Sequence, residues 1–134
     1  MHDERATTLG GVAGHAGLFS TAADLARYGA LYLPSRATVW FVRSHQDATV
    51  GLNERRGLGW QRWTPECFAS PRANPQGFGH TGFTGTSLWI DPEREVVIVL
   101  LTNRVHYGRQ PHILTIRKQV HTLLHEELGS LPSA

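Results

Sequence analysis

The sequence predicts an α+β fold in which helices flank an antiparallel sheet. Two apolar segments, residues 84–90 and 95–102, are separated only by the turn sequence of residues 91–94 (DPER), and strands joined this closely run antiparallel. The second segment is apolar on both faces, so both sides of the sheet should be covered. The chain then ends in a segment with helical spacing. We expect one domain over residues 1–134.

The composition excludes several classes of protein. Lys and Arg number 13 against 11 Asp and Glu, and the basic residues are scattered, which argues against nucleic-acid binding. No apolar run approaches the roughly 20 residues of a membrane span. The single cysteine, Cys67, cannot form an internal disulfide. The N-terminus lacks the features of a signal peptide, so localisation, cytoplasmic or periplasmic, stays open.

The first helix is predicted from a capping signal. Residues 1–19 are rich in Gly and Ala without a period, which favours an ordered loop or a short irregular approach. Thr21 can then cap a helix, with Asp24 three residues further on, and Pro34 stops the helical spacing. A weaker helix is expected over residues 35–43.

Residues 57–63 (GLGWQRW) alternate apolar and polar residues after a glycine, which predicts a strand that ends at Pro65. We expect Trp60 and Trp63 on one face of this strand, where a place in the core is favoured over the lining of a pocket. A proline-containing loop leads from there to a glycine-rich strand that begins at Gly79.

The final helix is predicted from apolar residues at steps of three and four, which form one stripe that should lie on the sheet. They are Ile113, Ile116, Val120, Leu123, Leu124 and Leu128. Gly129 is the expected C-cap. His121 and His125 have the spacing of two metal ligands on one helix face. No acidic residue lies between them and no third ligand is evident, so a solvated helix face is favoured and no metal or other cofactor is expected.

Residues 80–86 (HTGFTGT) have the character of an active-site wall. Gly82 and Gly85 have no Cβ, so a ligand could approach the backbone closely, and three threonines supply hydroxyl groups. The threonines would also fit a strand without any function. Glycines weaken a strand, however, which favours the binding wall.

Two stretches resemble one enzyme superfamily. Residues 9–28, and residues 57–60 followed by 79–86, are similar to the C-terminal part of serine beta-lactamases and penicillin-binding proteins, in the class C and esterase-like branch of beta-lactamase-related serine hydrolases. The resemblance implies the beta-lactamase/transpeptidase-like αβα sandwich, here incomplete at the N-terminus. Residues 1–3 (MHD) are similar to a Val-His-Asp of relatives, which favours a true beginning further upstream.

The family hydrolyses esters, peptide amides or beta-lactams through an acyl-serine, with three motifs. The first, Ser-x-x-Lys, is absent, since the single lysine, Lys118, is preceded at that spacing by Thr115. The second, Tyr-x-Asn, is absent as well, and only the third, at residues 80–82, is present. We therefore expect the chain to be inactive alone and to bind a small-molecule or peptide substrate only when an N-terminal region completes it.

The resemblance also implies roles for single residues. The backbone N–H of Phe83 would form half of the oxyanion hole. His80 stands where many relatives carry lysine and offers a weaker fixed charge, which disfavours beta-lactam hydrolysis. Thr81, Gly82 and Thr84 would contact the substrate.

Two alternatives stay open. The chain could be a non-catalytic fragment or pseudoenzyme, acting as a binding module or associating with itself through an exposed sheet edge. His15, in a glycine-rich loop, could point into the site, although a structural role is favoured.

Overall fold

The computed structural model describes residues 3–36, 39, 41, 44, 54–106, 108 and 112–130. The helix expected over residues 35–43 falls largely outside them. The elements that the structure does describe are listed here in chain order: α1 Glu4–Thr8, α2 Ala22–Ala30, β1 Gln61–Arg62, β2 Phe78–Thr81, β3 Ser87–Asp91, β4 Val96–Leu100 and α4 Ile113–Ser130.

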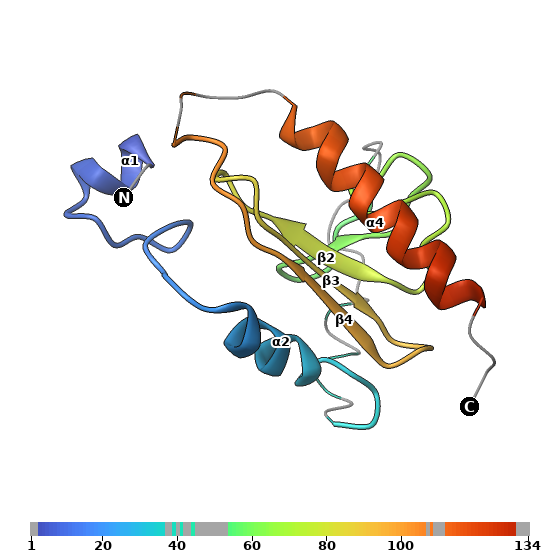
Figure 1. The fold of residues 1–134 in the computed structure, drawn as a ribbon. Helices are drawn as coiled ribbons and strands as arrows, with labels where there is room; N and C mark the ends of the chain where they lie inside the picture. Colours follow the sequence, from blue (N-terminus) through green and yellow to red (C-terminus); the bar gives the residue numbers. More distant parts are fainter. Residues whose placement is uncertain are drawn as a thin grey trace.

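The strands form one sheet with the order β1-β2-β3-β4, and every neighbouring pair is antiparallel. Helix α2 covers one face of the sheet and α4 covers the other (Figure 1). The predicted α+β class, an antiparallel sheet flanked by helices, is therefore confirmed. Within the described residues, no helix is long and apolar enough to cross a membrane.

Helix α2 begins where the capping signal predicts. The Thr21 hydroxyl accepts a hydrogen bond from Asp24 N at 3.2 Å and donates one to the Asp24 carboxylate at 2.9 Å. Near the other end of the helix, a Cβ on Gly29 would clash with Val97 of β4 and come close to Leu88 of β3. The missing side chain lets α2 lie directly on the sheet.

Each face of the sheet has its own apolar core, as the apolar second strand of the hairpin predicts. Along β4, Val97 and Val99 pack into the core beneath α2, whereas Val96 and Ile98 belong to the core beneath α4. The buried centre of the first core is Leu33, Trp60, Phe78, Leu88 and Ile90. The buried centre of the second is Cys67, Ala69, Ala73, Trp89 and Ile98.

Several local predictions are wrong for identifiable reasons. Residues 1–19, expected to be an irregular segment that leads to the first helix, contain α1, a helix too short to show the periodic spacing of apolar residues. The strand expected over residues 57–63 is reduced to Gln61–Arg62, because Gly57 N donates to Trp60 O and Gly59 has a φ of +82°. The helix α4 continues through Gly129 to Ser130 instead of ending there.

The two tryptophans lie in different cores rather than on one face. Trp60 is part of the core beneath α2, and Trp63 packs against the core beneath α4. Residues three apart in an extended chain point to opposite faces, which accounts for the separation. The preference for core positions is correct for both.

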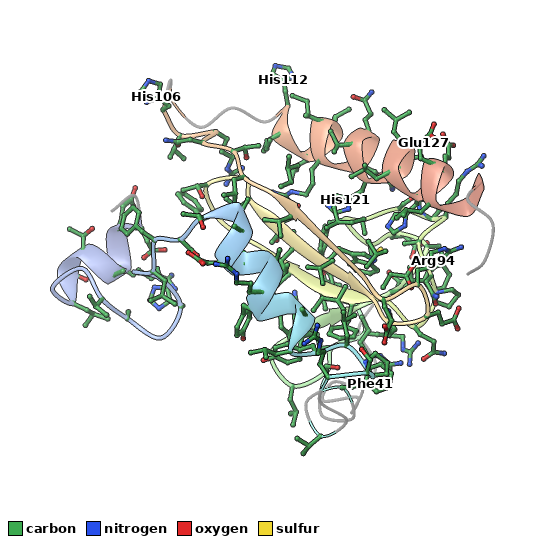
Figure 2. The ribbon with its side chains drawn as sticks, turned by 60° about the horizontal axis from the view of Figure 1, so that its bottom comes forward. Phe41, Arg94, His106, His112, His121 and Glu127 are labelled. Atoms are coloured by element: carbon green, nitrogen blue, oxygen red, sulfur yellow. The ribbon has the colours of Figure 1, made fainter. Side chains whose placement is uncertain are left out.

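The face of helix α4 that packs on the sheet is not the one predicted from the sequence. Arg117, His121 and His125 are buried, whereas Leu123 is 62% exposed and Ile116 is 48% exposed. Figure 2 shows His121 directed from α4 towards the sheet. The solvated position favoured for the two histidines is therefore wrong, and only part of the predicted apolar stripe packs on the sheet, including Ile113.

Burial of these histidines keeps them neutral. His121 Nε2 lies 3.0 Å from the Ser87 hydroxyl, and His121 Nδ1 and His125 Nε2 are buried without a hydrogen-bond partner in the described structure. Burial, with smaller contributions from His125 and Arg117, lowers the pKa of His121 to about 4. Burial also lowers the pKa of His125.

These shifts predict that the fold loses stability in mild acid. Above pH 6.5 the His121 ring is neutral in both the folded and the unfolded chain. Below pH 6.5 the ring becomes protonated in the unfolded chain, whereas in the folded chain it stays neutral until the pH approaches 4. Between pH 7.5 and pH 5 the loss from His121 should be about 2 kcal/mol, and His125 acts in the same direction. Urea unfolding at the two pH values measures it.

The control for this experiment is His112→Gln, because His112 is exposed at the start of α4 and the variant should keep the full pH dependence. His121→Gln should reduce it. If that variant does not fold, the pKa of His121 is measured by NMR titration of the unmodified chain. A midpoint near pH 6.5 would contradict the lowered pKa of His121.

Candidate functional site

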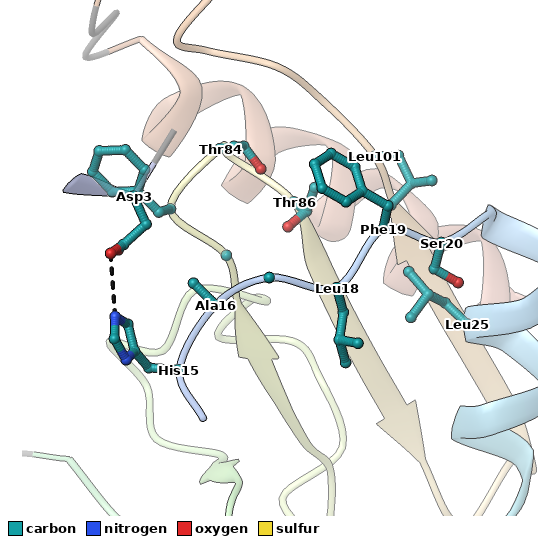
Figure 3. Close-up of a pocket in the computed structure, with 13 residues that line it drawn as sticks. Asp3, His15, Ala16, Leu18, Phe19, Ser20, Leu25, Thr84, Thr86 and Leu101 are labelled. Atoms are coloured by element: carbon teal, nitrogen blue, oxygen red, sulfur yellow. Dashed lines mark hydrogen bonds and ion pairs between the residues drawn. The ribbon is translucent and has the colours of Figure 1, made fainter. Parts of the chain in front are cut away.

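A pocket of about 480 Å³ opens where the loop before α2 meets the loop between β2 and β3 (Figure 3). The first loop contributes residues 15–20 and the second contributes Gly82, Phe83, Thr84 and Thr86. Asp3, Leu25 and Leu101 complete the lining. The pocket thus joins the two stretches of sequence that resemble the serine hydrolases, which lie far apart along the chain.

The loop between β2 and β3 is a tight turn. Gly82 N donates to Thr86 O at 2.9 Å, and Gly85 N donates to Gly82 O at 3.0 Å. Gly85 has a φ of +98°, a conformation that side chains other than glycine rarely adopt. A Cβ on Gly82 would clash with the Thr86 hydroxyl, and one on Gly85 would clash with Thr102 and Ile113. The positive φ of Gly85 and the packing in and around the turn therefore account for both glycines without any ligand.

The turn fixes the direction of the Phe83 N–H. The peptide between Gly82 and Phe83 is trans, because the described structure contains no cis peptide bond. Its carbonyl, Gly82 O, accepts the hydrogen bond from Gly85 N and faces the inside of the turn. In a trans peptide the N–H points opposite to the C=O. The Phe83 N–H is therefore directed out of the turn, and Phe83 itself lines the pocket.

Arg104 holds this loop from outside, a role that no sequence motif signals. Its Nε donates to Phe83 O at 2.6 Å, and its guanidinium carbon lies 5.0 Å from the centre of the Phe83 ring. Arg104 N also donates to Thr84 O at 2.9 Å. Arg104 lies in the segment after β4, which ends at Leu100, so the segment that leaves β4 braces the loop.

His80 lies on β2 and has both ring nitrogens engaged. One nitrogen, Nδ1, lies 2.8 Å from Thr81 O and must donate to it, whereas Nε2 lies 3.1 Å from Arg56 Nη1 and must accept from it. This arrangement requires the neutral imidazole. The positive charge at this place belongs to Arg56, which also pairs with Glu54 at 2.6 Å.

Thr81 faces away from the pocket side of the sheet. It pairs with Ser87 across β2 and β3, and directly opposed residues project to the same face. The Ser87 hydroxyl contacts His121 of α4, so this is the α4 face. Neither His80 nor Thr81 lines the pocket, whereas Gly82, Phe83 and Thr84 do.

Two further residues of the pocket, Asp3 and His15, form a pair. Asp3 Oδ1 accepts hydrogen bonds from Ala6 N at 2.7 Å and from His15 Nε2 at 3.1 Å. The bond from Ala6, followed by that from His15, lowers the pKa of the Asp3 carboxyl. His15 therefore points into the site, which the sequence left open. Asp3 was missed, although its position as N-cap of α1 follows an ordinary capping pattern.

No group of three or more potential ligands of the His, Cys, Asp or Glu type lies together among the described residues. His121 and His125, whose spacing is that of metal ligands, contact Ser87 and the rings of Phe68 and Trp89.

The bracing role of Arg104 predicts faster local opening of the loop when it is removed. Arg104→Ala should raise the hydrogen-exchange rate of the Gly82 and Gly85 amides about fivefold, as expected for the loss of about 1 kcal/mol. The replacement Arg94→Ala is the control, because Arg94 pairs with Asp91 at the opposite end of the hairpin. Equal exchange rates in Arg104→Ala and the unmodified chain would contradict the bracing role.

Comparison with known proteins identifies the family. The family model described as beta-lactamase matches residues 1–121. Putative D-alanyl-D-alanine carboxypeptidases are 42% identical over 119 residues in Escherichia coli O157:H7 and 44% identical over 119 residues in Salmonella gallinarum. Each alignment covers 79% of this chain and 27% of the relative, so the chain spans about a quarter of their length. No solved structure matches. The chain belongs to the beta-lactamase family, within the superfamily of serine beta-lactamases and penicillin-binding proteins.

Proposed function

We propose that this chain forms the substrate-binding wall of a serine hydrolase that cleaves an ester, a peptide amide or a beta-lactam. The orientation of the Phe83 N–H carries the proposal. Phe83 lines the pocket and its N–H is directed out of the turn, and oxyanion holes are built from preorganised donors of this kind, which stabilise the developing charge without reorganising. The similarity to putative D-alanyl-D-alanine carboxypeptidases favours a D-alanyl peptide as the substrate.

The remaining wall residues have distinct parts in this proposal. Gly82 and Thr84 border the pocket beside Phe83 and contact the substrate. Thr81 and His80 lie just before them on β2, where His80, hydrogen-bonded to Arg56 and to Thr81 O, orients the start of the loop. The nucleophile and its base belong to a Ser-x-x-Lys motif that this sequence lacks. The chain alone therefore binds substrate without turnover.

Fragment complementation tests both halves of this proposal. The chain is mixed with the part of the E. coli relative that excludes the segment it matches, and release of D-alanine from a D-alanyl-D-alanine peptide is measured. We expect turnover only in the mixture, with no burst from a chromogenic ester and no penicillin labelling of the chain alone. Covalent labelling of the isolated chain would contradict the proposal.

The oxyanion role has its own pair of variants within that mixture. Phe83→Pro removes the N–H and should lower kcat about 10²- to 10³-fold. Phe83→Ala keeps the N–H and should retain most activity. Thermal unfolding of each variant checks that the fold is intact. Equal activity of the two variants would exclude the Phe83 N–H as an oxyanion donor.

A second candidate, association through uncovered surface, is favoured by α4 and β4. Strand β4 pairs only with β3 among the described strands, and α4 exposes Leu114, Ile116 and Leu123. Exposed sheet edges and exposed apolar side chains such as Ile116 and Leu123, which lie on the same side of α4, can recruit partners.

Self-association therefore predicts concentration-dependent dimers in analytical ultracentrifugation. Leu123→Glu should weaken the dimer about tenfold, whereas Gln119→Glu, at another exposed position of α4, should leave it unchanged. A monomer at all concentrations would exclude this candidate.

A further inference from the structure

Helix α4 contacts the loop between β2 and β3 and the strand that leaves it. Ile113, the first residue of α4, is 6% exposed and fills the space that a Cβ on Gly85 would need. About two turns further along the helix, His121 Nε2 lies 3.0 Å from the Ser87 hydroxyl. The loop that presents the Phe83 N–H therefore rests on α4 at its tip and at its base.

Ser87 forms the base of this loop. It is the first residue of β3 and pairs with Thr81, the last residue of β2, so that residues 82–86 span the gap between them. The contact with α4 is shielded from water, since Ser87 is 3% exposed and His121 is 0% exposed. Loss of a hydrogen bond between two buried groups leaves a polar atom without water to replace the partner. The bond to His121 therefore fixes the base of the loop more firmly than a surface contact would.

The His121 ring is itself held in place. The Phe68 ring packs edge-on against it, with the ring centres 5.6 Å apart and the planes at 83°. On the helix side the His125 ring lies nearly parallel, at 26° and 6.3 Å. The next residue of α4, Thr122, donates to the Ser70 hydroxyl at 3.2 Å. A side chain locked by its neighbours in this way can hold another residue in a precise position.

The choice of histidine at this position has a cost that packing does not explain. His121 Nδ1 is buried without a hydrogen-bond partner among the described residues, and burying an unpartnered polar atom is unfavourable. A leucine in the same place would bury apolar surface without that cost. What the imidazole adds is its hydrogen bond to Ser87.

We propose that His121 is a positioning residue for the reaction: it fixes Ser87, and through Ser87 the loop that presents the Phe83 N–H. The inference rests on the proposed function, because the direction of this N–H matters to catalysis only if it is an oxyanion donor. His121 does not line the pocket and acts from the opposite face of the sheet. Helix α4 thereby becomes part of the support of the site.

Four variants test the role in turnover, in the mixture with the complementary part of the E. coli relative. His121→Leu removes the bond to Ser87 and should lower kcat about fivefold with KM unchanged, because the donor acts on the transition state. His121→Gln keeps a polar group able to reach the Ser87 hydroxyl and should retain most of kcat. Ser87→Ala should match His121→Leu, and combining the two should lower kcat no further.

His125→Leu is the matched control. His125 lies one turn further along α4 and is 5% exposed, and its Nε2 has no hydrogen-bond partner among the described residues. This variant replaces a buried imidazole on the same helix without touching Ser87, so kcat should stay unchanged. An equal fall of kcat in His125→Leu would overturn the proposal, as would an unchanged kcat in His121→Leu.

Hydrogen exchange of the full chain alone separates this inference from the proposed function. His121→Leu should raise the exchange rate of the Gly82 and Gly85 amides about fivefold, and His125→Leu should not. Ser87→Ala gives the same readout if His121→Leu does not fold. Equal exchange in these variants and in the unmodified chain would overturn the positioning role. If exchange rises as expected but the unmodified mixture shows no turnover, the proposed function fails while the support of the loop by His121 stands.

Discussion

The hydrogen bond from Gly85 N to Gly82 O determines the direction of the Phe83 N–H in the candidate site. It turns the Gly82 carbonyl inward, and the planarity of the peptide then directs the Phe83 N–H outward. Three residues in and around the loop stabilise this turn. Gly85 supplies the positive φ, Thr86 fills the space that a side chain on Gly82 would need, and Arg104 holds the carbonyl of Phe83.

The sheet gives this turn a rigid base. Strands β2 and β3 lead into and out of the loop, and their neighbour β4 leads to Arg104. Because both faces of the sheet are packed, by α2 on one side and α4 on the other, the strands cannot shift independently. The α4 side contains buried polar groups, Arg117 and His121 among them, so its packing depends on the histidine being neutral.

The parts of the fold that depend on neighbouring residues were predicted from the sequence. Thr21 as a helix N-cap predicts the start of α2, and the short turn before Glu95 requires β3 and β4 to be antiparallel. The face that α4 lays on the sheet could not be predicted, because the helix carries aliphatic residues on more than one side. Contacts with the sheet determine which face of α4 is buried. The buried face carries His121, whose ring is hydrogen-bonded to the Ser87 hydroxyl, and Leu123 is left exposed.

The candidate site shows the same division. A resemblance in sequence located the loop of residues 80–86, but it did not distinguish residues that line the pocket from those that support it. His80 engages Arg56, which lies 24 residues earlier, and Asp3 engages His15 across α1. Neither pair follows from spacing along the chain. The two glycines of the loop were correctly singled out, although the turn and not a ligand explains them.

A structure of the complemented enzyme acylated by a penicillin would test the central claim most directly. The measured quantity is the distance from Phe83 N to the carbonyl oxygen of the acyl group. A distance of about 2.7–3.1 Å, with the N–H aimed at that oxygen, is the predicted result. An acyl oxygen bound to other donors, with Phe83 N beyond hydrogen-bond reach, would contradict the assignment of this loop as an oxyanion wall.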